Sequence, residues 1–255
     1  MKKMLALLAV LILLGFGNAL AIPTLGGEAP DLQVVLDDLT VDPSTGTDPG
    51  DTFDSSIDVT SNYLADTSDS TWSVSGSGTS VATMIIEVAG WANVNSFGVY
   101  NGSDEVTLFD GAAGAGEKVF LSIEDDFSVV ISNSVVGFDY DTGIDFSSDS
   151  FGFFITNSPG DTFYSNTALN DDGVDHMLAY QGNNIDTIKL PGLAAGTWTD
   201  NEWLLAFEDT FGGGDDDYQD LVLMIESVEP IPEPGTLLLL GSGLIGLAYL
   251  KRRKA

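Results

Sequence analysis

Short runs of apolar and aromatic residues, separated by glycine, asparagine and aspartate, recur through most of the chain after residue 80. Each run has the length of a β-strand, and the residues between runs are those that turns prefer. Val119–Glu124 ends in an alternation of apolar and polar residues, as in a half-buried strand, whereas Leu221–Ile225 is apolar throughout and is expected in the middle of a sheet. We predict strands at Val81–Val88, Phe97–Tyr100, Val106–Phe109, Val119–Ile123, Phe127–Ile131, Val135–Phe138, Phe151–Ile155, Met177–Tyr180, Ile185–Leu190, Trp203–Phe207 and Leu221–Ile225.

The number and spacing of these runs predict an all-β fold, an antiparallel β-sandwich of jelly-roll-like architecture. We expect it to span residues 22–230 as one secreted domain that is rich in serine and threonine in its first third. Two further strands are predicted there, around Ile57–Val59 and Trp72–Val74. One short helix is predicted ahead of them, from apolar residues spaced by three and four positions: Leu32, Val35, Leu36 and Leu39.

The N-terminal segment has the three parts of a secretory signal peptide. Residues 1–21 comprise a basic start with Lys2 and Lys3, an apolar run over Leu5–Phe16, and a small-residue triplet that ends at Ala21. We predict that signal peptidase cleaves after Ala21. An uncleaved anchor is the alternative.

The C-terminal segment, residues 231–255, pairs a second apolar run with basic residues. It begins with Pro232, Glu233 and Pro234, continues over Gly235–Leu250 and ends in the basic cluster Lys251, Arg252, Arg253 and Lys254. A helix over the apolar run extends about 24 Å, less than the roughly 30 Å of a bilayer's hydrocarbon core. We predict a short transmembrane helix whose basic end stays in the cytoplasm, which leaves the chain between the two ends outside the inner membrane.

The Pro-Glu-Pro triplet, the short apolar helix and the terminal basic cluster together resemble the PEP-CTERM sorting signal. The resemblance implies a substrate of exosortase, an enzyme of the inner membrane of Gram-negative bacteria that recognises such a tail and cuts near the triplet. It also implies transient anchoring in the membrane, followed by a location at the cell surface or outside the cell. A plain C-terminal anchor is the alternative.

Two parts of the predicted β domain carry a second resemblance. The first is Thr83–Glu87 with Asn95–Tyr100, and the second is Phe207–Asp209 with Gly213–Asp220. These residues resemble domain of unknown function 4114, a secreted bacterial β domain often found ahead of PEP-CTERM tails. The resemblance covers most of the chain from residue 84 to 225 and implies no activity. Gln219 departs from it, because an asparagine is expected there.

The net charge of the chain limits the partners that it can bind. The chain has 39 acidic and 8 basic residues, and between residues 22 and 231 the balance is 38 acids against 2 bases, a net charge of −36. Such a chain repels phosphate backbones, so we expect no nucleic-acid partner. The absence of cysteine removes disulfides and thiolate zinc sites, so a core or bound ions must hold the fold together.

Metal binding is the chemistry that the residues support best. Residues 208–220 contain six carboxylates and three consecutive glycines between two apolar strands, and the candidate ligands are Glu208, Asp209, Asp215, Asp217 and Asp220. Calcium suits such a set, because it takes six to eight oxygen ligands at flexible geometry. Weaker candidates are Asp139, Asp141 and Asp145 in one turn, and Asn170 and Asp172 beside His176 in another; solvated acidic turns are the alternative for all of them.

The function expected from these features is that of a calcium-stabilised structural or interaction protein of the cell surface or of the extracellular matrix of exopolysaccharide and biofilm. We do not expect an enzyme, because the one histidine, His176, is the only base for a serine hydrolase and no Gly-x-Ser-x-Gly elbow is present. A carbohydrate-binding module for exopolysaccharide is the main alternative, and a secreted hydrolase is the weaker one. Tryptophans would supply the module's sugar-stacking platform, and Trp198 is the one expected at the surface.

Overall fold

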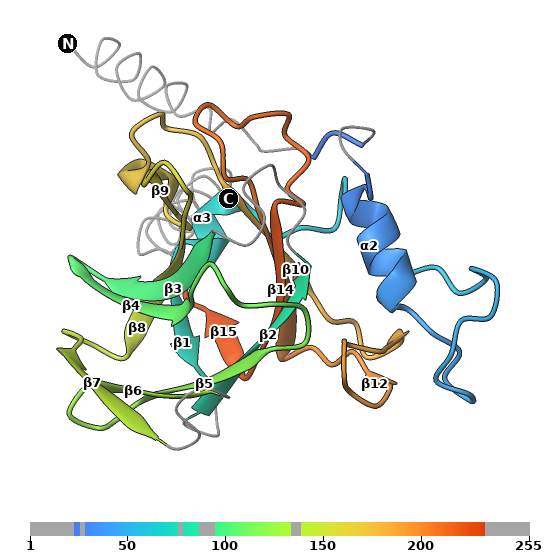
Figure 1. Ribbon diagram of the computed structural model, residues 1–255, viewed down its shortest axis with the longest axis horizontal. Helices are drawn as coiled ribbons and strands as arrows, with labels where there is room; N and C mark the ends of the chain where they lie inside the picture. Colours follow the sequence, from blue (N-terminus) through green and yellow to red (C-terminus); the bar gives the residue numbers. More distant parts are fainter. Residues whose placement is uncertain (1–22, 26–28, 76–78, 87–94, 134–138, 233–255) are drawn as a thin grey trace, which may run out of the picture.

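The computed structural model describes residues 23–25, 29–75, 79–86, 95–133 and 139–232 (Figure 1). The predicted signal peptide, the basic cluster and the strand at Val135–Phe138 lie outside these residues. The described chain contains two short α-helices, α2 (Leu32–Leu39) and α3 (Asp66–Asp69), and a 3₁₀ turn, η1 (Thr167–Leu169). The strands are β1 (Trp72–Val74), β2 (Thr79–Ile86), β3 (Ser96–Asn101), β4 (Asp104–Phe109), β5 (Lys118–Ile123), β6 (Ser128–Asn133), β7 (Tyr140–Asp145), β8 (Ser150–Thr156), β9 (Thr162–Tyr164), β10 (Met177–Gln181), β11 (Thr187–Ile188), β12 (Gly196–Thr197), β13 (Glu202–Phe207), β14 (Leu221–Glu226) and β15 (Val228–Pro230).

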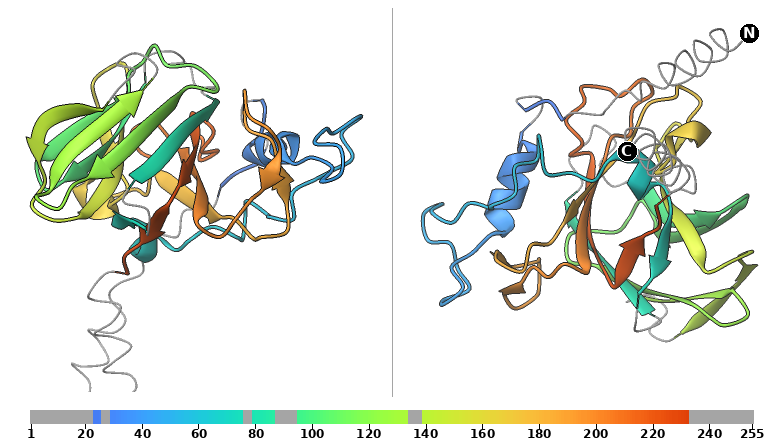
Figure 2. Two further views of the ribbon diagram at one scale, coloured as in Figure 1. Left: turned by 90° about the horizontal axis from the view of Figure 1, so that it is seen from below. Right: turned by 180° about the vertical axis from the view of Figure 1, so that it is seen from behind.

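The strands form two large sheets and one small one (Figures 1 and 2). The six-stranded sheet has the order β15-β1-β8-β3-β4, with β9 paired to β8, and the seven-stranded sheet has the order β10-β13-β14-β2-β5-β6-β7. The pairs within both sheets are antiparallel. The predicted mostly-β, antiparallel fold is therefore confirmed, while the jelly-roll-like sandwich stays a prediction.

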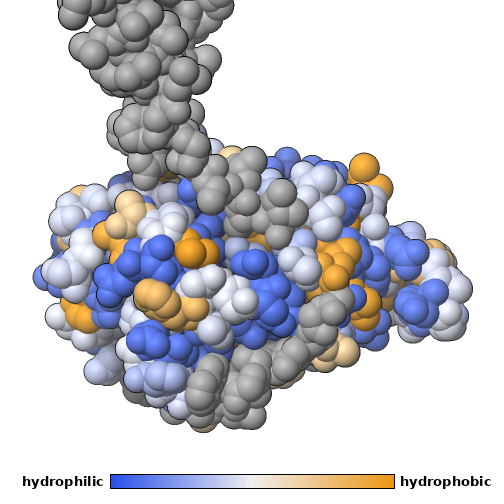
Figure 3. Space-filling view, turned by 90° about the horizontal axis from the view of Figure 1, so that it is seen from above, coloured by the Kyte–Doolittle hydropathy of each residue, from blue (hydrophilic) through white to orange (hydrophobic). Residues whose placement is uncertain are grey.

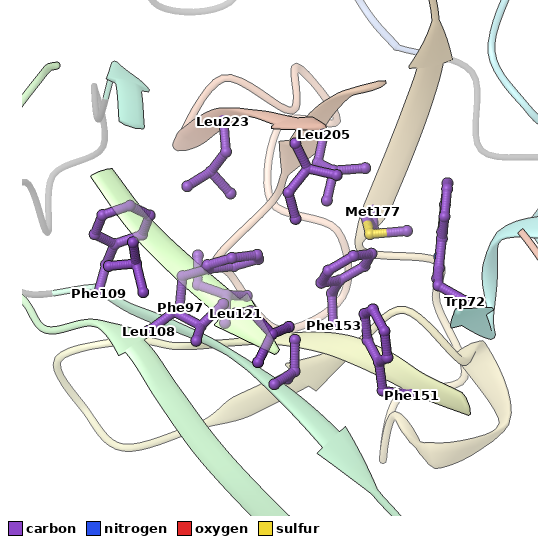
Figure 4. Packing of buried hydrophobic residues seen from close by; sticks show 14 of the residues in the cluster. Trp72, Phe97, Leu108, Phe109, Leu121, Phe151, Phe153, Met177, Leu205 and Leu223 are labelled. Atoms are coloured by element: carbon purple, nitrogen blue, oxygen red, sulfur yellow. The ribbon is translucent and has the colours of Figure 1, made fainter. Parts of the chain in front are cut away.

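The larger hydrophobic core takes side chains from both large sheets (Figure 4). Phe97 and Phe153 come from the six-stranded sheet, and their rings stack with centroids 5.7 Å apart. Leu205 and Leu223 come from the seven-stranded sheet and point toward these rings. Trp72 closes one end of the core, where its ring meets that of Trp203 edge-on at 5.0 Å.

A second core lies on the other face of the seven-stranded sheet, beneath α2. All four apolar residues that predicted this helix are buried, which confirms the prediction. Successive residues of a strand point to opposite faces, so Leu223 of β14 enters the first core while Val222 and Met224 enter the second. This double burial explains why β14 is apolar throughout, and its predicted place in the middle of a sheet is confirmed.

The predicted strand at Ile57–Val59 is wrong. These two residues are buried under α2, but the side chain of Gln33 replaces a neighbouring strand. Its Nε2 donates to the carbonyl of Ile57 at 3.1 Å, and its Oε1 accepts from the Val59 amide at 3.0 Å. One glutamine thus satisfies backbone groups that the alternating pattern assigned to a sheet.

The expected exposure of Trp198 is also wrong, because this side chain is fully buried in the second core. Its indole Nε1 donates to the carbonyl of Glu202 at 3.2 Å, and its ring lies over Gly182, where a Cβ would come within 2.5 Å of it. Trp72 and Trp203 are buried as well, and Trp91 lies outside the described residues. The described tryptophans therefore offer no platform for sugar stacking.

The described surface on the face shown in Figure 3 is mostly hydrophilic, with apolar residues in separate patches. Across the described ranges, no helix combines the length and the apolar character needed to cross a membrane. The transmembrane helix predicted over Gly235–Leu250 lies outside those ranges.

Candidate metal centre

The connection between β13 and β14 carries the predicted ligands. We call residues 208–220 the acidic loop; it is the orange trace above β14 in Figure 1. The two strands pair so that Phe207 lies opposite Leu221. Glu208 and Asp220 are the next residue on each side of that pair, so antiparallel pairing itself brings the two carboxylates together.

The apex of the acidic loop depends on glycine. Gly212, Gly213 and Gly214 have φ values of 82°, 82° and 48°, in the left-handed region that side chains disfavour. A Cβ on Gly214 would overlap Oε1 of Glu208. The glycine run therefore lets the backbone fold closely over the Glu208 carboxylate.

The structure brings all five of the stronger candidate ligands together, in two groups of three. We call Glu208, Asp209 and Asp220 the inner triad, and Glu208, Asp215 and Asp217 the outer triad. Within each triad, one oxygen from each residue lies within 4.8 Å of the others. Since calcium binds oxygen at about 2.3–2.6 Å, three oxygens at this spacing can contact the same ion.

Glu208 is fully enclosed at the middle of the centre, where the two triads meet. It is 1% exposed, and its Oε2 is buried with no hydrogen-bond partner in the described chain. Its backbone is fixed on both sides by His176, whose carbonyl accepts from the Glu208 amide at 3.0 Å and whose Nδ1 donates to the Glu208 carbonyl at 2.9 Å. A buried oxygen held in place without a donor is costly unless a proton or a cation satisfies it.

Amide side chains hold two of the aspartates in place. Asn95 Nδ2 donates to Oδ2 of Asp209 at 2.7 Å, and Asn157 Nδ2 donates to the Asp209 carbonyl at 2.9 Å. Gln219 Nε2 donates to Oδ2 of Asp217 at 2.6 Å, so the glutamine that departs from the expected asparagine positions a carboxylate. Sequence reasoning missed Asn95 and Asn157, because no local pattern links them to a loop so distant in the chain.

Burial raises the pKa values of two carboxyl groups in the centre. It raises the pKa of Glu208 to about 10, and the nearby charges of Asp220, Asp215 and Asp217 add to the effect. Burial likewise raises the pKa of Asp220 to about 7, although the Asp209 amide that donates to it at 2.8 Å opposes the shift. Without a cation, the centre therefore retains a proton at neutral pH.

The segment around His176 supports the acidic loop from the side. Asp172 Oδ2 accepts from the Gly212 amide at 2.7 Å and lies 2.9 Å from His176 Nε2. Both ring nitrogens of His176 are thus engaged, and its ring stacks on Phe163 at 3.9 Å. The Asn170 side chain accepts from the Tyr164 amide at the end of β9 and donates to the Val174 carbonyl in its own turn. In this structure the side chains of Asp172 and Asn170 bind backbone groups, and Asp172 belongs to neither triad among the described residues.

The third predicted acidic turn shows a different arrangement. Asp139, Asp141 and Asp145 are exposed, and the last two belong to the edge strand β7. Asp141 Oδ1 accepts from the Gly143 amide at 2.8 Å, as turn-forming aspartates do. Within the described ranges, these three residues form no group of ligand atoms like the two triads.

Comparison with known families identifies two regions of the chain. Residues 129–228 match the family described as "Domain of unknown function (DUF4114)", and residues 230–254 match the "PEP-CTERM protein-sorting motif". Both resemblances are confirmed, although the first match begins later than the resemblance at Thr83–Glu87. The sorting motif implies an exported protein that exosortase processes. Pro232 is exposed at the end of the described chain, and Glu233 and Pro234 lie beyond it. No curated protein and no solved structure matches the chain.

Proposed function

We propose that this exported protein, which carries a DUF4114 domain directly ahead of a PEP-CTERM motif, is a calcium-stabilised structural or interaction protein of the cell surface or extracellular matrix. In this proposal its two large sheets form an antiparallel, jelly-roll-like sandwich, and calcium in the acidic loop fixes the connection between β13 and β14. Signal peptidase and exosortase are its processing partners, and exopolysaccharide is the matrix component that it meets.

The observation that carries the calcium proposal is the buried Oε2 of Glu208, which accepts no hydrogen bond from any described residue and lies in a centre built of four further carboxylates. Two like charges 4 Å apart repel by about 4 kcal/mol at an effective dielectric constant of 20. Among the described residues, no lysine or arginine forms an ion pair with Glu208, Asp209 or Asp220. A divalent cation would relieve the repulsion and supply the missing partner of Glu208 at the same time.

The donor set favours calcium over magnesium. The ligands come from strand ends and from a glycine-rich apex, and Asp215 is exposed whereas Asp217 is 3% exposed. Calcium accepts such uneven sets, because its coordination number and geometry vary. Magnesium requires a near-ideal octahedron at about 2.0–2.1 Å and retains several of its waters.

The first prediction concerns heat stability. Millimolar calcium will raise the unfolding temperature of the full-length chain, purified in a mild detergent and stripped with EDTA, and magnesium will raise it much less. An ion at one hundred times its dissociation constant adds about 2.7 kcal/mol to the free energy of unfolding. For a domain of this size, that raises the unfolding temperature by roughly 5–10 °C. Differential scanning calorimetry in EDTA, calcium and magnesium measures the shifts.

The matched control is Asp216→Asn. Asp216 is an exposed acid of the same loop that belongs to neither triad, and its φ of 60° is one that asparagine also tolerates. It should keep the full calcium shift. Equal shifts with calcium and magnesium, or no shift with either ion, would overturn the calcium proposal.

The second prediction concerns pH. In EDTA, the unfolding temperature will rise as the pH is lowered from about 8 to 5. Glu208 and Asp220 bind protons more tightly in the folded state, with pKa values of about 10 and 7 against ordinary values of 4.5 and 3.8. Their contribution is complete below the ordinary values and is lost as the pH rises toward the folded values. Burial of Asp175, whose pKa is raised to about 7, acts in the same direction.

Calcium reverses part of this trend, because it displaces the protons that its ligands hold. The gain in unfolding temperature between EDTA and calcium should therefore be larger at pH 8 than at pH 5. A calorimetric series at four pH values, with and without calcium, measures it. A calcium gain that does not change with pH would contradict the assignment of Glu208 and Asp220 as ligands.

A further inference from the structure

We propose that the acidic loop binds two calcium ions side by side, bridged by the carboxylate of Glu208. This inference rests on the proposed function, since it requires that the loop bind calcium at all. It adds the number of ions, the ligands of each and the order in which they are held.

The division of the ligands carries the inference. Glu208 is the only residue shared by the inner and outer triads; Asp209 and Asp220 belong to one, and Asp215 and Asp217 to the other. Among the described residues, the five oxygens do not form one group within 4.8 Å of each other, as the ligands of a single ion would. The geometry therefore fits two adjacent metal centres that share the carboxylate of Glu208.

The position of the Glu208 carboxylate suits a bridge. Its Oε1 lies against the backbone at Gly214, the residue before Asp215, so this oxygen is beside the outer ligands. Its Oε2 is buried and has no hydrogen-bond partner in the described chain. One oxygen for each ion would complete both triads, and ions that share ligands in this way lie about 4 Å apart.

Charge also favours two ions. The five carboxylates carry five negative charges when ionised, so one calcium ion leaves a net charge of −3 and two leave −1. Glu208, Asp209 and Asp217 are each at most 3% exposed, so water screens the remaining charge poorly. The second ion removes most of the repulsion that the first leaves behind.

The two centres differ in rigidity. The inner ligands Asp209 and Asp220 flank the paired strand ends, and the Asp209 amide donates to Asp220 Oδ2 at 2.8 Å. Of the outer ligands, Asp217 is buried and held by Gln219, whereas Asp215 is exposed beside the glycine-rich apex, where packing does not hold its side chain in one position. Preorganised ligands bind more tightly, so the inner ion will bind first and the outer ion at higher calcium concentration.

The test is the calcium stoichiometry of the full-length, chelator-stripped chain, measured by isothermal titration calorimetry and equilibrium dialysis. We expect two ions per chain in two resolved events. Asp215→Asn should remove the weaker event alone, Asp220→Asn should disrupt the tighter one, and Glu208→Gln should remove both. Asp216→Asn, which deletes the same charge from the same loop, should retain two ions.

A second measurement does not depend on variants. Terbium and europium replace calcium in oxygen sites, and chains loaded with a mixture of the two should show strong energy transfer from terbium to europium, because the ions lie within a few ångströms of each other. One ion per chain without such transfer would overturn the bridged pair and leave the calcium proposal standing. Absence of any calcium binding would overturn both.

Discussion

Glu208→Gln should melt at a higher temperature than the wild-type chain when both are measured in EDTA at pH 7.5, although it loses the response to calcium. In the wild type, folding places this carboxyl where its pKa rises to about 10, so the folded state must take up a proton that the unfolded state has released at this pH. The difference between pH 7.5 and the ordinary value of 4.5 corresponds to about 4 kcal/mol as an upper bound. Glutamine has nearly the same shape and does not incur this cost.

The expected gain in EDTA is therefore about 2–4 kcal/mol, or roughly 4–16 °C in unfolding temperature. It should fall to about 0.4 kcal/mol near pH 4.5, where the glutamate of the unfolded state is half protonated, and vanish about one pH unit lower. Calorimetry of the two chains from pH 4.5 to 8 measures it, and Glu117→Gln, which removes an exposed glutamate, is the control that should change little. A variant less stable than the wild type in EDTA would show that Glu208 holds the fold by direct contacts and not as a ligand.

Gly98→Ala should cause a large loss of stability, because the added methyl group has no space within the sheet. Gly98 lies in β3, between Phe154 of β8 and Thr107 of β4. A Cβ there would overlap the carbonyl oxygen of Val106 and lie 2.6 Å from the ring of Phe154. The oxygen belongs to a paired backbone and cannot move without breaking the ladder, so we expect a loss of at least about 3 kcal/mol.

The comparison variant for this prediction is Gly114→Ala. A Cβ at Gly114 meets no heavy atom within 4 Å, so this change should be neutral or slightly stabilising. Chemical denaturation of both variants in calcium measures the difference, and Gly98→Ala should unfold at a much lower denaturant concentration or fail to fold. Equal midpoints would show that β3 and β4 are not packed as described.

Much of the fold could be predicted because the main strands bury apolar residues. The runs that became β3, β8, β13 and β14 lie in the sheets close to the predicted bounds. Strands β7, β9, β12 and β15 were not predicted, because they are short or polar and are defined by their partners. Ile57 and Val59 show the reverse case, in which an alternating pattern was satisfied by the side chain of Gln33.

The candidate site was predictable in its composition and not in its geometry. The density of acids and glycines identified the loop, and the structure brings its five stronger candidates together. Their division into two triads depends on the pairing of Phe207 with Leu221 and on the support of Asn95 and Asn157, which come from other elements. Neither the strand pairing nor this support can be predicted from the sequence of the loop itself.

The strand order also determines when the domain can complete its fold during export. β14 fills the middle of the seven-stranded sheet and β15 pairs with β1 in the other, yet both come from residues 221–230, just ahead of Pro232. A chain that crosses the membrane with its N-terminus first cannot complete either sheet until these last strands have emerged. The acidic loop, which closes only when β14 joins β13, will be among the final parts to form. Folding therefore finishes on the outer side of the membrane, after the segment directly ahead of the sorting motif has emerged.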